Sequence, residues 1–178
     1  MLFELWTSFV LSWFILFPAY AANSMPVLAR GRRPLDFGKI WGGKRILGDG
    51  KTIEGTAVGT IAGFAVGLAE YYLMPSLQFY AGNITIPEIT PIVAIMIAIG
   101  TMVGDIVGSF IKRRKNMPRG GQAPILDRLG FIIAAIIFAY PFVKITLGMI
   151  VIMLIITFII HKASNSFAHK MKLKSVPW

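Results

Sequence analysis

The sequence contains no cysteine, which excludes disulfides, thiolate nucleophiles and zinc sites with cysteine ligands. It has only two histidines, His161 and His169, both close to the C-terminus, so a histidine-based zinc site is not expected either. Acidic residues are few: eight Asp and Glu stand against 18 Lys and Arg, a formal net charge of +10. In contrast, 56% of the residues are hydrophobic and the mean hydropathy is positive. One soluble core of this size does not need so many apolar side chains, so we expect a membrane protein.

The chain has five apolar segments long enough, or nearly so, for the roughly 20 helical residues that cross a bilayer. We predict an all-α polytopic membrane protein, a single domain over residues 1–178, with five transmembrane helices. The first segment is interpreted as a permanent helix rather than a signal peptide, because no basic region precedes it and Glu4 lies near its start. The last two segments are nearly continuous, so a helical hairpin and one long helix are both open, and the charge pattern favours the hairpin. The predicted spans are about 2–20, 53–73, 92–111, 129–142 and 145–160.

Basic residues gather in alternate connections between these segments. Seventeen of the eighteen lie in two long loops, about 23–52 and 112–128, or in the tail 161–178, and the remaining one is Lys144. Lys and Arg are costly inside hydrocarbon and are enriched in cytoplasmic loops. We therefore expect a multi-pass protein of the cell membrane with its N-terminus outside and with both long loops and the C-terminus in the cytoplasm.

Glycines recur every four residues in two of the predicted spans. Small residues at this spacing allow helix backbones to approach closely in lipid. One interpretation is that the stripes pack helices against each other or against a second copy of the chain, and this is the more common use. The other is that a stripe forms the floor of a groove for lipid chains. The stripes are Gly55, Gly59, Gly63 and Gly67 in the second span, and Gly100, Gly104 and Gly108 in the third.

Three carboxylates are expected at the cytoplasmic ends of helices. Asp105 lies seven residues before Lys112 in the third span, about 10 Å below the helix end. A carboxylate at this depth needs a cation, a donor network or a proton, and is by default a functional candidate, although a salt bridge to a neighbouring helix is the plain structural alternative. Glu54 opens the second span and Asp127 opens the fourth. Oxygen ligands of this kind amid positive charge suit Mg²⁺ that also binds substrate phosphates.

Two glycine-rich stretches are candidates for phosphate binding. Backbone N–H groups and the positive end of the helix dipole favour an anion where such a stretch runs into a helix N-terminus. The stretch 42–52 fits this description, and so does the stretch 118–121. Neither has the spacing of a Walker A motif, although Gly50, Lys51 and Thr52 resemble its end. Juxtamembrane basic residues most often fix topology or bind anionic headgroups, which is the alternative for any one of them.

The run from Ser109 to Arg128 resembles the signature of CDP-diacylglycerol synthases. It has a Ser followed three residues later by Lys112 and Arg113, a Pro-x-Gly-Gly turn at 118–121, and an Asp-Arg pair at 127–128 that opens the next helix. The sequence departs from that signature at Asn116 and Arg119, and at Gly130 just beyond the run. The stretches 22–26, 34–39 and 48–55, with the small size and five spans, resemble the CDP-archaeol synthases, the archaeal counterpart of that family.

This resemblance implies an Mg²⁺-dependent nucleotidyltransferase. The expected reaction moves the CMP part of CTP to an unsaturated isoprenoid ether-lipid phosphate, 2,3-di-O-geranylgeranylglyceryl phosphate, and releases pyrophosphate and CDP-archaeol for membrane phospholipid biosynthesis. We assign Mg²⁺ binding to Asp105 and Asp127. Phosphate clamping and catalysis are assigned to Lys112, Arg114 and Arg119, with Glu54 as a third metal ligand or as a residue that orients a basic side chain. Nucleotide binding is assigned to Asn23, Lys44, Lys51, Thr52, Gly120 and Gly121.

Two other functions are weighed against this one. A small transporter for an anionic solute would use the basic residues as an electrostatic funnel, but beyond Asp105 and Thr101 the third span is apolar towards the outside. A CDP-alcohol phosphotransferase would need a run of spaced Asp residues that this chain lacks. The expected partners are CTP, the lipid phosphate and membrane lipids, with no nucleic acid. The sequence leaves the oligomeric state open.

Overall fold

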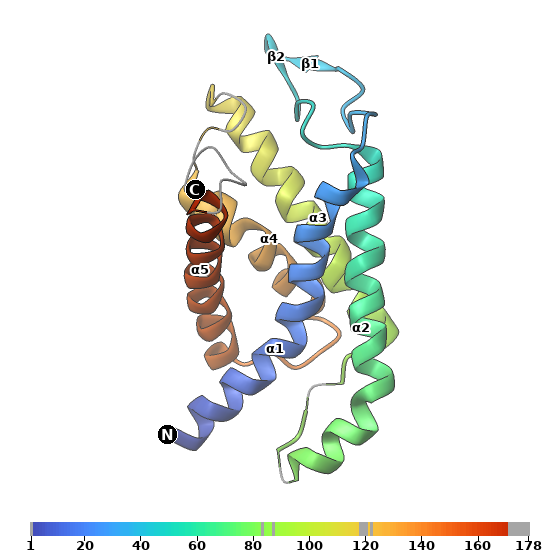
Figure 1. Cartoon of the computed structure of the whole chain (residues 1–178), viewed down its shortest axis with the longest axis vertical. Helices are drawn as coiled ribbons and strands as arrows, with labels where there is room; N and C mark the ends of the chain where they lie inside the picture. The colour runs from blue at the N-terminus through green and yellow to red at the C-terminus, as the bar shows by residue number, and fades with distance from the viewer. Residues whose placement is uncertain (1, 83, 87, 118–120, 122, 171–178) are drawn as a thin grey trace.

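The computed structural model describes residues 2–82, 84–86, 88–117, 121 and 123–170. These residues form a bundle of five α-helices with a short β-hairpin at one end (Figure 1). The elements are α1 (Leu2–Ser24), the 3₁₀ turn η1 (Met25–Ala29), β1 (Ile40–Trp41), β2 (Lys44–Arg45), α2 (Ile53–Ala81), α3 (Pro91–Arg114), α4 (Pro124–Ala139) and α5 (Leu147–Lys170).

The starts of the helices carry ordinary start signals. Thr52 caps α2, because its hydroxyl accepts a hydrogen bond from the Gly55 backbone N–H at 3.1 Å. Thr90 caps α3 in the same way, and Pro91 follows it at the first helical position. Proline also begins α4 at Pro124. These local signals fix the residues at which α2, α3 and α4 begin.

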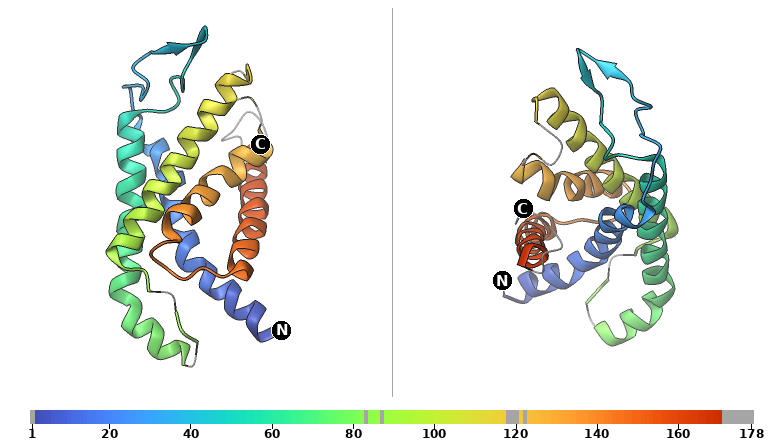
Figure 2. Two further views of the ribbon diagram at one scale, coloured as in Figure 1. Left: turned by 180° about the vertical axis from the view of Figure 1, so that it is seen from behind. Right: turned by 45° about the horizontal axis from the view of Figure 1, so that its top comes forward.

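A core of aliphatic side chains joins α1, α3, α4 and α5. Fully buried members include Leu16 of α1, Ile97 of α3, Ile132 of α4 and Met153 of α5. The two helices α2 and α5 lie on opposite sides of the bundle (Figures 1 and 2). Many large apolar side chains point outward, among them Phe3, Trp6 and Ile137, as expected of helices that face lipid.

The glycine stripes are helix-packing surfaces. A methyl group at Gly59 would lie 2.6 Å from both the Ala22 carbonyl oxygen and the Met102 sulfur, so α2 is in close contact with α1 and α3 there. A methyl group at Gly104 would meet the Gly130 carbonyl oxygen of α4. The interpretation of these two positions as the floor of a lipid groove is therefore wrong, because backbone of a neighbouring helix already occupies the space.

The all-α membrane fold is confirmed, with differences in detail. All five apolar segments form helices, and residues 140–146 separate α4 from α5. In the described part of the chain, three helices are long and apolar enough to cross a membrane, over Phe3–Ala29, Ile53–Ala81 and Pro91–Arg114. The apolar part of α5 is shorter, Leu147–Ala163, and α4 has 16 residues. Five crossings therefore stay a prediction.

The first long loop contains a β-hairpin that the sequence analysis missed. Ile40 pairs with Arg45 and Trp41 with Lys44 in antiparallel register. The two residues between the strands, Gly42 and Gly43, have φ of 58° and 75°, and such positive values are what a tight two-residue hairpin turn requires. Gly42 and Gly43 thus form the hairpin tip, and only residues 48–52 of the expected phosphate-binding stretch run into the start of α2.

One end of the bundle carries most of the charge. The hairpin, the start of α2, the end of α3, the start of α4 and the end of α5 all lie at this end, opposite the N-terminus (Figure 1). We call it the basic end, defined by the basic residues of 30–51, 112–115 and Arg128. The charge separation that the sequence predicts is therefore present in three dimensions.

Candidate active site

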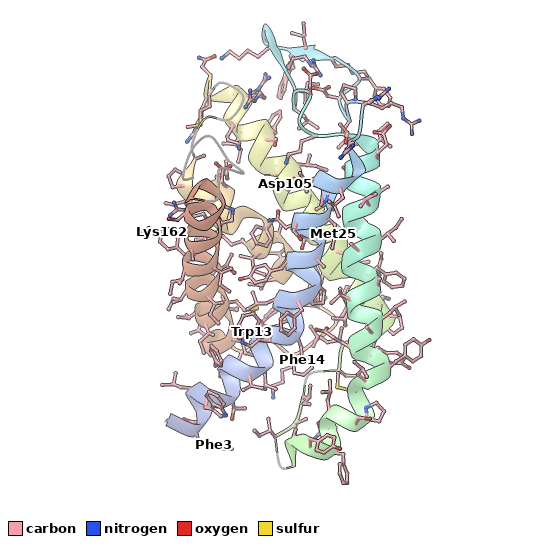
Figure 3. All side chains as sticks on the ribbon, in the orientation of Figure 1. Phe3, Trp13, Phe14, Met25, Asp105 and Lys162 are labelled. Atoms are coloured by element: carbon pink, nitrogen blue, oxygen red, sulfur yellow. The ribbon has the colours of Figure 1, made fainter. Side chains whose placement is uncertain are left out.

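Asp105 and Asp127 come together inside the basic end, in a small cavity of about 40 Å³. Asp105 projects from α3 towards the end of α1 (Figure 3), and Asp127 lies in the first turn of α4. The cavity is also lined by Asn23 of α1 and by Ser109 and Lys112 of α3. Oxygen-bearing side chains from three helices thus meet at one point, although they lie far apart in the sequence.

Each of the two carboxylates is paired with a lysine. The Lys51 ammonium group donates to Asp105 Oδ2, and the Lys112 ammonium group lies 2.5 Å from Asp127 Oδ1. Asp127 also fixes the start of α4, because its Oδ2 accepts from the Ala123 N–H at 3.0 Å. All four side chains are only partly exposed. A partly buried pair is less screened by water than a surface pair, so the attraction within each pair is weakened less than it would be in open solvent.

Two larger hollows adjoin this cavity and share its residues. The first, of about 230 Å³, lies between η1, α2 and α3 and contains Lys51 and Asp105. The second, of about 300 Å³, lies below the first loop and contains Lys51, Ser109, Lys112 and Arg113. Shared walls make the three hollows one contiguous site at the start of α2.

Asp36 organises the loop that covers this site. Its carboxylate accepts backbone N–H bonds from Gly38 at 3.1 Å, Leu47 at 2.9 Å and Gly48 at 3.0 Å. The Arg45 guanidinium completes the set at 2.7 Å. The Arg45 bond and the backbone donors hold the pKa of Asp36 well below its usual range. Asp36 was part of the family resemblance in the sequence, but no role followed from the sequence alone.

We expect Asp36→Asn to loosen residues 37–50. In the folded chain the pKa of the Asp36 carboxyl is lower than in the unfolded chain. The ionised carboxylate therefore stabilises the folded loop fully above about pH 4, and this stabilisation is lost as the pH falls towards the pKa of the folded state. At pH 7 the variant should be cut by trypsin at Lys39 and Lys44 about tenfold faster than the unchanged chain.

The matched control is Asp49→Asn. Asp49 also pairs with Arg45, but its side chain is 60% exposed, whereas that of Asp36 is 1% exposed. An exposed pair stabilises little, so the control should be cut at the original rate. Equal cleavage of both variants would contradict the role given to Asp36.

Arg114 anchors the hairpin to α3. Its guanidinium donates to the carbonyl oxygens of Trp41, Lys44 and Arg45, the last at 2.7 Å. It also lies over the rings of Trp41 and Phe110, which stack with centroids 5.8 Å apart. Its contacts are thus with the loop backbone, not with the cavity. The neighbouring Arg113, which belongs to the signature in the sequence but was assigned no role there, lines the second hollow instead.

The remaining candidate residues are spread around this centre. Thr52 caps α2 and lines the first hollow. Glu54 turns to Arg33, with Oε1 at 2.7 Å from Nε, so it orients a basic residue of the first loop. Lys44 lies in β2, where its carbonyl oxygen accepts from Arg114. Arg119 and Gly120 fall outside the described residues, and Gly121 is described only as irregular backbone.

The donor set of the small cavity fits a hard divalent cation. Two carboxylates, an amide oxygen of Asn23 and the Ser109 hydroxyl line it, and Mg²⁺ is bound by one or two carboxylates with waters and substrate phosphates rather than by a full protein cage. Within the described residues no group of three or more His, Cys, Asp and Glu is placed to hold a metal by protein ligands alone. The site therefore suits an ion that arrives with a phosphate ligand.

A family model for CarS-like CDP-archaeol synthases matches residues 4–178 of the chain. The chain belongs to this family. A CDP-archaeol synthase of Pyrococcus horikoshii is 50% identical over 167 residues, which cover 93% of this chain and 94% of the relative. One from Halobacterium salinarum is 40% identical and covers 97% of each chain.

A solved structure described as an intramembrane enzyme for archaeal membrane lipid biosynthesis has the same fold as this member of the CDP-archaeol synthase family. It superposes with a TM-score of 0.73 at 35% identity and covers 85% of this chain and 90% of the solved one. The resemblance to CDP-archaeol synthases that the sequence predicts is therefore confirmed over most of the chain.

Proposed function

We propose that the chain transfers the CMP part of CTP to an unsaturated isoprenoid ether-lipid phosphate, forming CDP-archaeol and pyrophosphate. The observation that carries this proposal is the convergence of two carboxylate–lysine pairs in one cavity at the start of α2, in a chain of this family. Family membership favours this reaction over the anion transporter that the sequence left open.

The reaction needs positioning and charge neutralisation more than proton transfer. A phosphate oxygen of the lipid attacks the α-phosphorus of CTP, the bond from that phosphorus to the β-phosphate breaks, and pyrophosphate leaves. The attacking phosphate is already ionised near neutral pH, so no general base is required. Most of the rate acceleration must then come from cations and N–H donors aimed at the phosphates.

Lys51 and Lys112 are the residues best placed for that task. Both line the contiguous site, and both are paired with a carboxylate that lies next to the space for phosphates. Arg113 lines the same hollow. The backbone from Gly48 to Thr52 leads into α2, whose N-terminal N–H groups and dipole favour an anion. We assign the triphosphate to this region, and Arg119 from outside the described residues to the leaving pyrophosphate.

Asp105 and Asp127, with Asn23 and Ser109, are the residues that would hold Mg²⁺. A bound Mg²⁺ would offset the negative charge of the triphosphate. Lys51 and Lys112 each form an ion pair with one of these two carboxylates.

We further propose that the basic end faces the cytoplasm and that the N-terminus lies outside. Lys and Arg concentrate on the cytoplasmic side of membrane proteins, and here the basic residues of the first loop and of 112–115 lie at the same end of the bundle as Asp105 and Asp127. The site then lies at the level of lipid headgroups, where a soluble nucleotide and a lipid phosphate meet.

The test is an assay of the purified chain in detergent with CTP, Mg²⁺ and the ether-lipid phosphate, followed by mass spectrometry of the lipid fraction. We expect CDP-lipid and an equal amount of pyrophosphate, no product in EDTA, and recovery when Mg²⁺ is added back. Absence of CDP-lipid from well-folded protein with either ether or ester lipid phosphates would refute the proposal.

A further inference from the structure

Residues 37–43 of the first loop form an exposed surface that the proposed reaction does not use, and we call it the exposed loop surface. It includes the hairpin of β1 and β2, which projects beyond the ends of α2 and α3 at the basic end (Figures 1 and 2). Three of its side chains are large and apolar: Phe37 is 72% exposed, Ile40 67% and Trp41 61%. Such side chains are costly to expose to water, so their grouping in a charged loop indicates a contact surface.

Phe37 is held in a backbone conformation that is unusual for an aromatic residue. Its φ is 49°, in the left-handed region that bulky side chains disfavour. The Phe37 N–H donates to the Pro34 carbonyl oxygen at 3.1 Å, and the Gly38 N–H donates to the Asp36 carboxylate. Glycine or asparagine would suit this turn better than phenylalanine. An exposed aromatic ring in an unfavourable conformation is explained by a contact outside the chain.

Trp41 connects the exposed loop surface with an outward-facing side of α3. Its ring stacks on the ring of Phe110, with centroids 5.8 Å apart, and the Arg114 guanidinium lies over both rings. Phe110 shares a helix face with Val107, one turn deeper, whose side chain is 46% exposed. Because α3 is long and apolar enough to cross a membrane, this face is one that meets lipid. Its apolar surface continues through Phe110 and Trp41 into the hairpin, which therefore lies where the bilayer ends.

The charge around the exposed loop surface is positive. The first loop holds seven basic residues and two acidic ones, Asp36 and Asp49. Both acidic side chains pair with Arg45, so they do not offset the charges of the exposed Arg32 and Lys39. Apolar side chains amid Lys and Arg fit the headgroup region of a bilayer with anionic lipids, where tryptophan is also enriched.

We propose that the exposed loop surface docks on the anionic surface of the bilayer that the helices cross. Phe37, Ile40 and Trp41 lie at the depth of the headgroups, and Lys39 contacts lipid phosphates. The lipids of this contact are those of the surrounding leaflet, not the substrate, so the inference goes beyond the proposed function.

Docking also positions the part of the loop that enters the candidate active site. Asp36 adjoins Phe37 and accepts hydrogen bonds from the Leu47 and Gly48 N–H groups. Gly48 begins the stretch 48–52 that leads into α2. A hairpin fixed on the membrane therefore restrains this stretch through the Asp36 contacts.

The first test measures depth with a single spin label. The sequence has no cysteine, so Ile40→Cys introduces a unique site for a nitroxide. The matched control is Asp49→Cys, a 60% exposed position of the same loop outside the exposed loop surface. In nanodiscs that contain phosphatidylglycerol, we expect the ratio of collisions with oxygen to collisions with a water-soluble nickel chelate to be at least about fivefold higher at position 40, because apolar oxygen concentrates in the bilayer and the chelate in water.

Three other outcomes would overturn the proposal. Equal ratios at the two positions would place residue 40 in water. An equally high ratio at position 40 in nanodiscs of phosphatidylcholine alone would remove the role given to anionic headgroups. Dipolar broadening between labels at position 40 would show that a second copy of the chain covers this face. None of these outcomes bears on cytidylyl transfer, so the proposed function is tested separately.

The second test is protection of Lys39 from trypsin. We expect the unchanged chain to be cut there at least about fivefold more slowly in phosphatidylglycerol nanodiscs than in phosphatidylcholine nanodiscs. Phe37→Asn suits the left-handed turn but lacks the ring, so it should lose most of this protection. The control Tyr80→Asn removes an 84% exposed ring near the other end of α2 and should keep the protection. Full protection of Phe37→Asn would contradict the docking.

Discussion

Asp105→Asn is expected to reduce cytidylyl transfer at least about 10³-fold without unfolding the chain. The substitution keeps the size and one hydrogen-bonding oxygen of the side chain but removes its charge. The side chain at position 105 would then no longer attract a divalent cation, and it would no longer form the ion pair with Lys51. The loss should fall mainly on kcat, because this charge acts where negative charge accumulates on the phosphates in the transition state.

The control for Asp105→Asn is Glu88→Gln, which removes a carboxylate charge from an exposed residue outside the five helices. Both variants should elute from size exclusion and melt like the unchanged chain, and Glu88→Gln should keep full activity. If Asp105→Asn retained activity within about fivefold of the unchanged chain, Asp105 would be a structural partner of Lys51 and the assigned cavity would be the wrong one.

Gly104→Ala is expected to destabilise the bundle far more than the same change at Gly130. A methyl group at 104 would meet the Gly130 carbonyl oxygen and lie 2.8 Å from Ala134 Cβ, so α3 and α4 would have to separate. At Gly130 the nearest atom would lie 3.7 Å away, which is ordinary contact. Overpacking of this kind costs about 1–3 kcal/mol, whereas alanine is favoured over glycine by about 1 kcal/mol inside a helix.

Thermal unfolding in one detergent measures this difference. Gly104→Ala should lower Tm by about 5 °C or more, and Gly130→Ala should leave it unchanged or raise it slightly. Because α3 and α4 carry Asp105 and Asp127, the residual activity of Gly104→Ala should fall with its stability. Equal Tm values for the two variants would mean that α3 and α4 do not pack through Gly104 in the membrane.

Much of the architecture was predictable because a membrane imposes simple constraints. Apolar segments of limited length become helices, and basic side chains are excluded from hydrocarbon, so five helices and one charged end follow from the sequence. The meeting of Asp105 and Asp127 was also predictable, since both residues were expected at helix ends on the same side. Their pairing with Lys51 and Lys112 could not be predicted from the sequence, because it depends on how each helix is rotated about its own axis in the bundle.

The first loop was the least predictable part. Short strands carry little periodicity, and the glycine pair 42–43 suits a hairpin turn as well as a phosphate loop. The contacts of Asp36 are long-range hydrogen bonds to residues 45–48, which spacing alone does not reveal. Arg113 and Arg114 are adjacent and chemically identical, so only the direction of α3 decides that one lines the site and the other holds the hairpin.

The glycine stripes illustrate a different limit. Their spacing predicts close helix contact but does not say whether the close partner is protein or lipid. In this chain the close partner includes backbone of α1, α3 or α4 at five of the seven positions: Gly59, Gly63, Gly67, Gly100 and Gly104.

The most direct measurement of the central claim is the fate of two labels in CTP. Parallel reactions with α-³²P and γ-³²P CTP, Mg²⁺ and the ether-lipid phosphate are extracted into organic and aqueous phases. We expect α-label in the lipid and γ-label only in aqueous pyrophosphate, because the bond between the α- and β-phosphates is the one that breaks. Label from the γ-position in the lipid, or no label in lipid from either CTP, would contradict cytidylyl transfer by this chain.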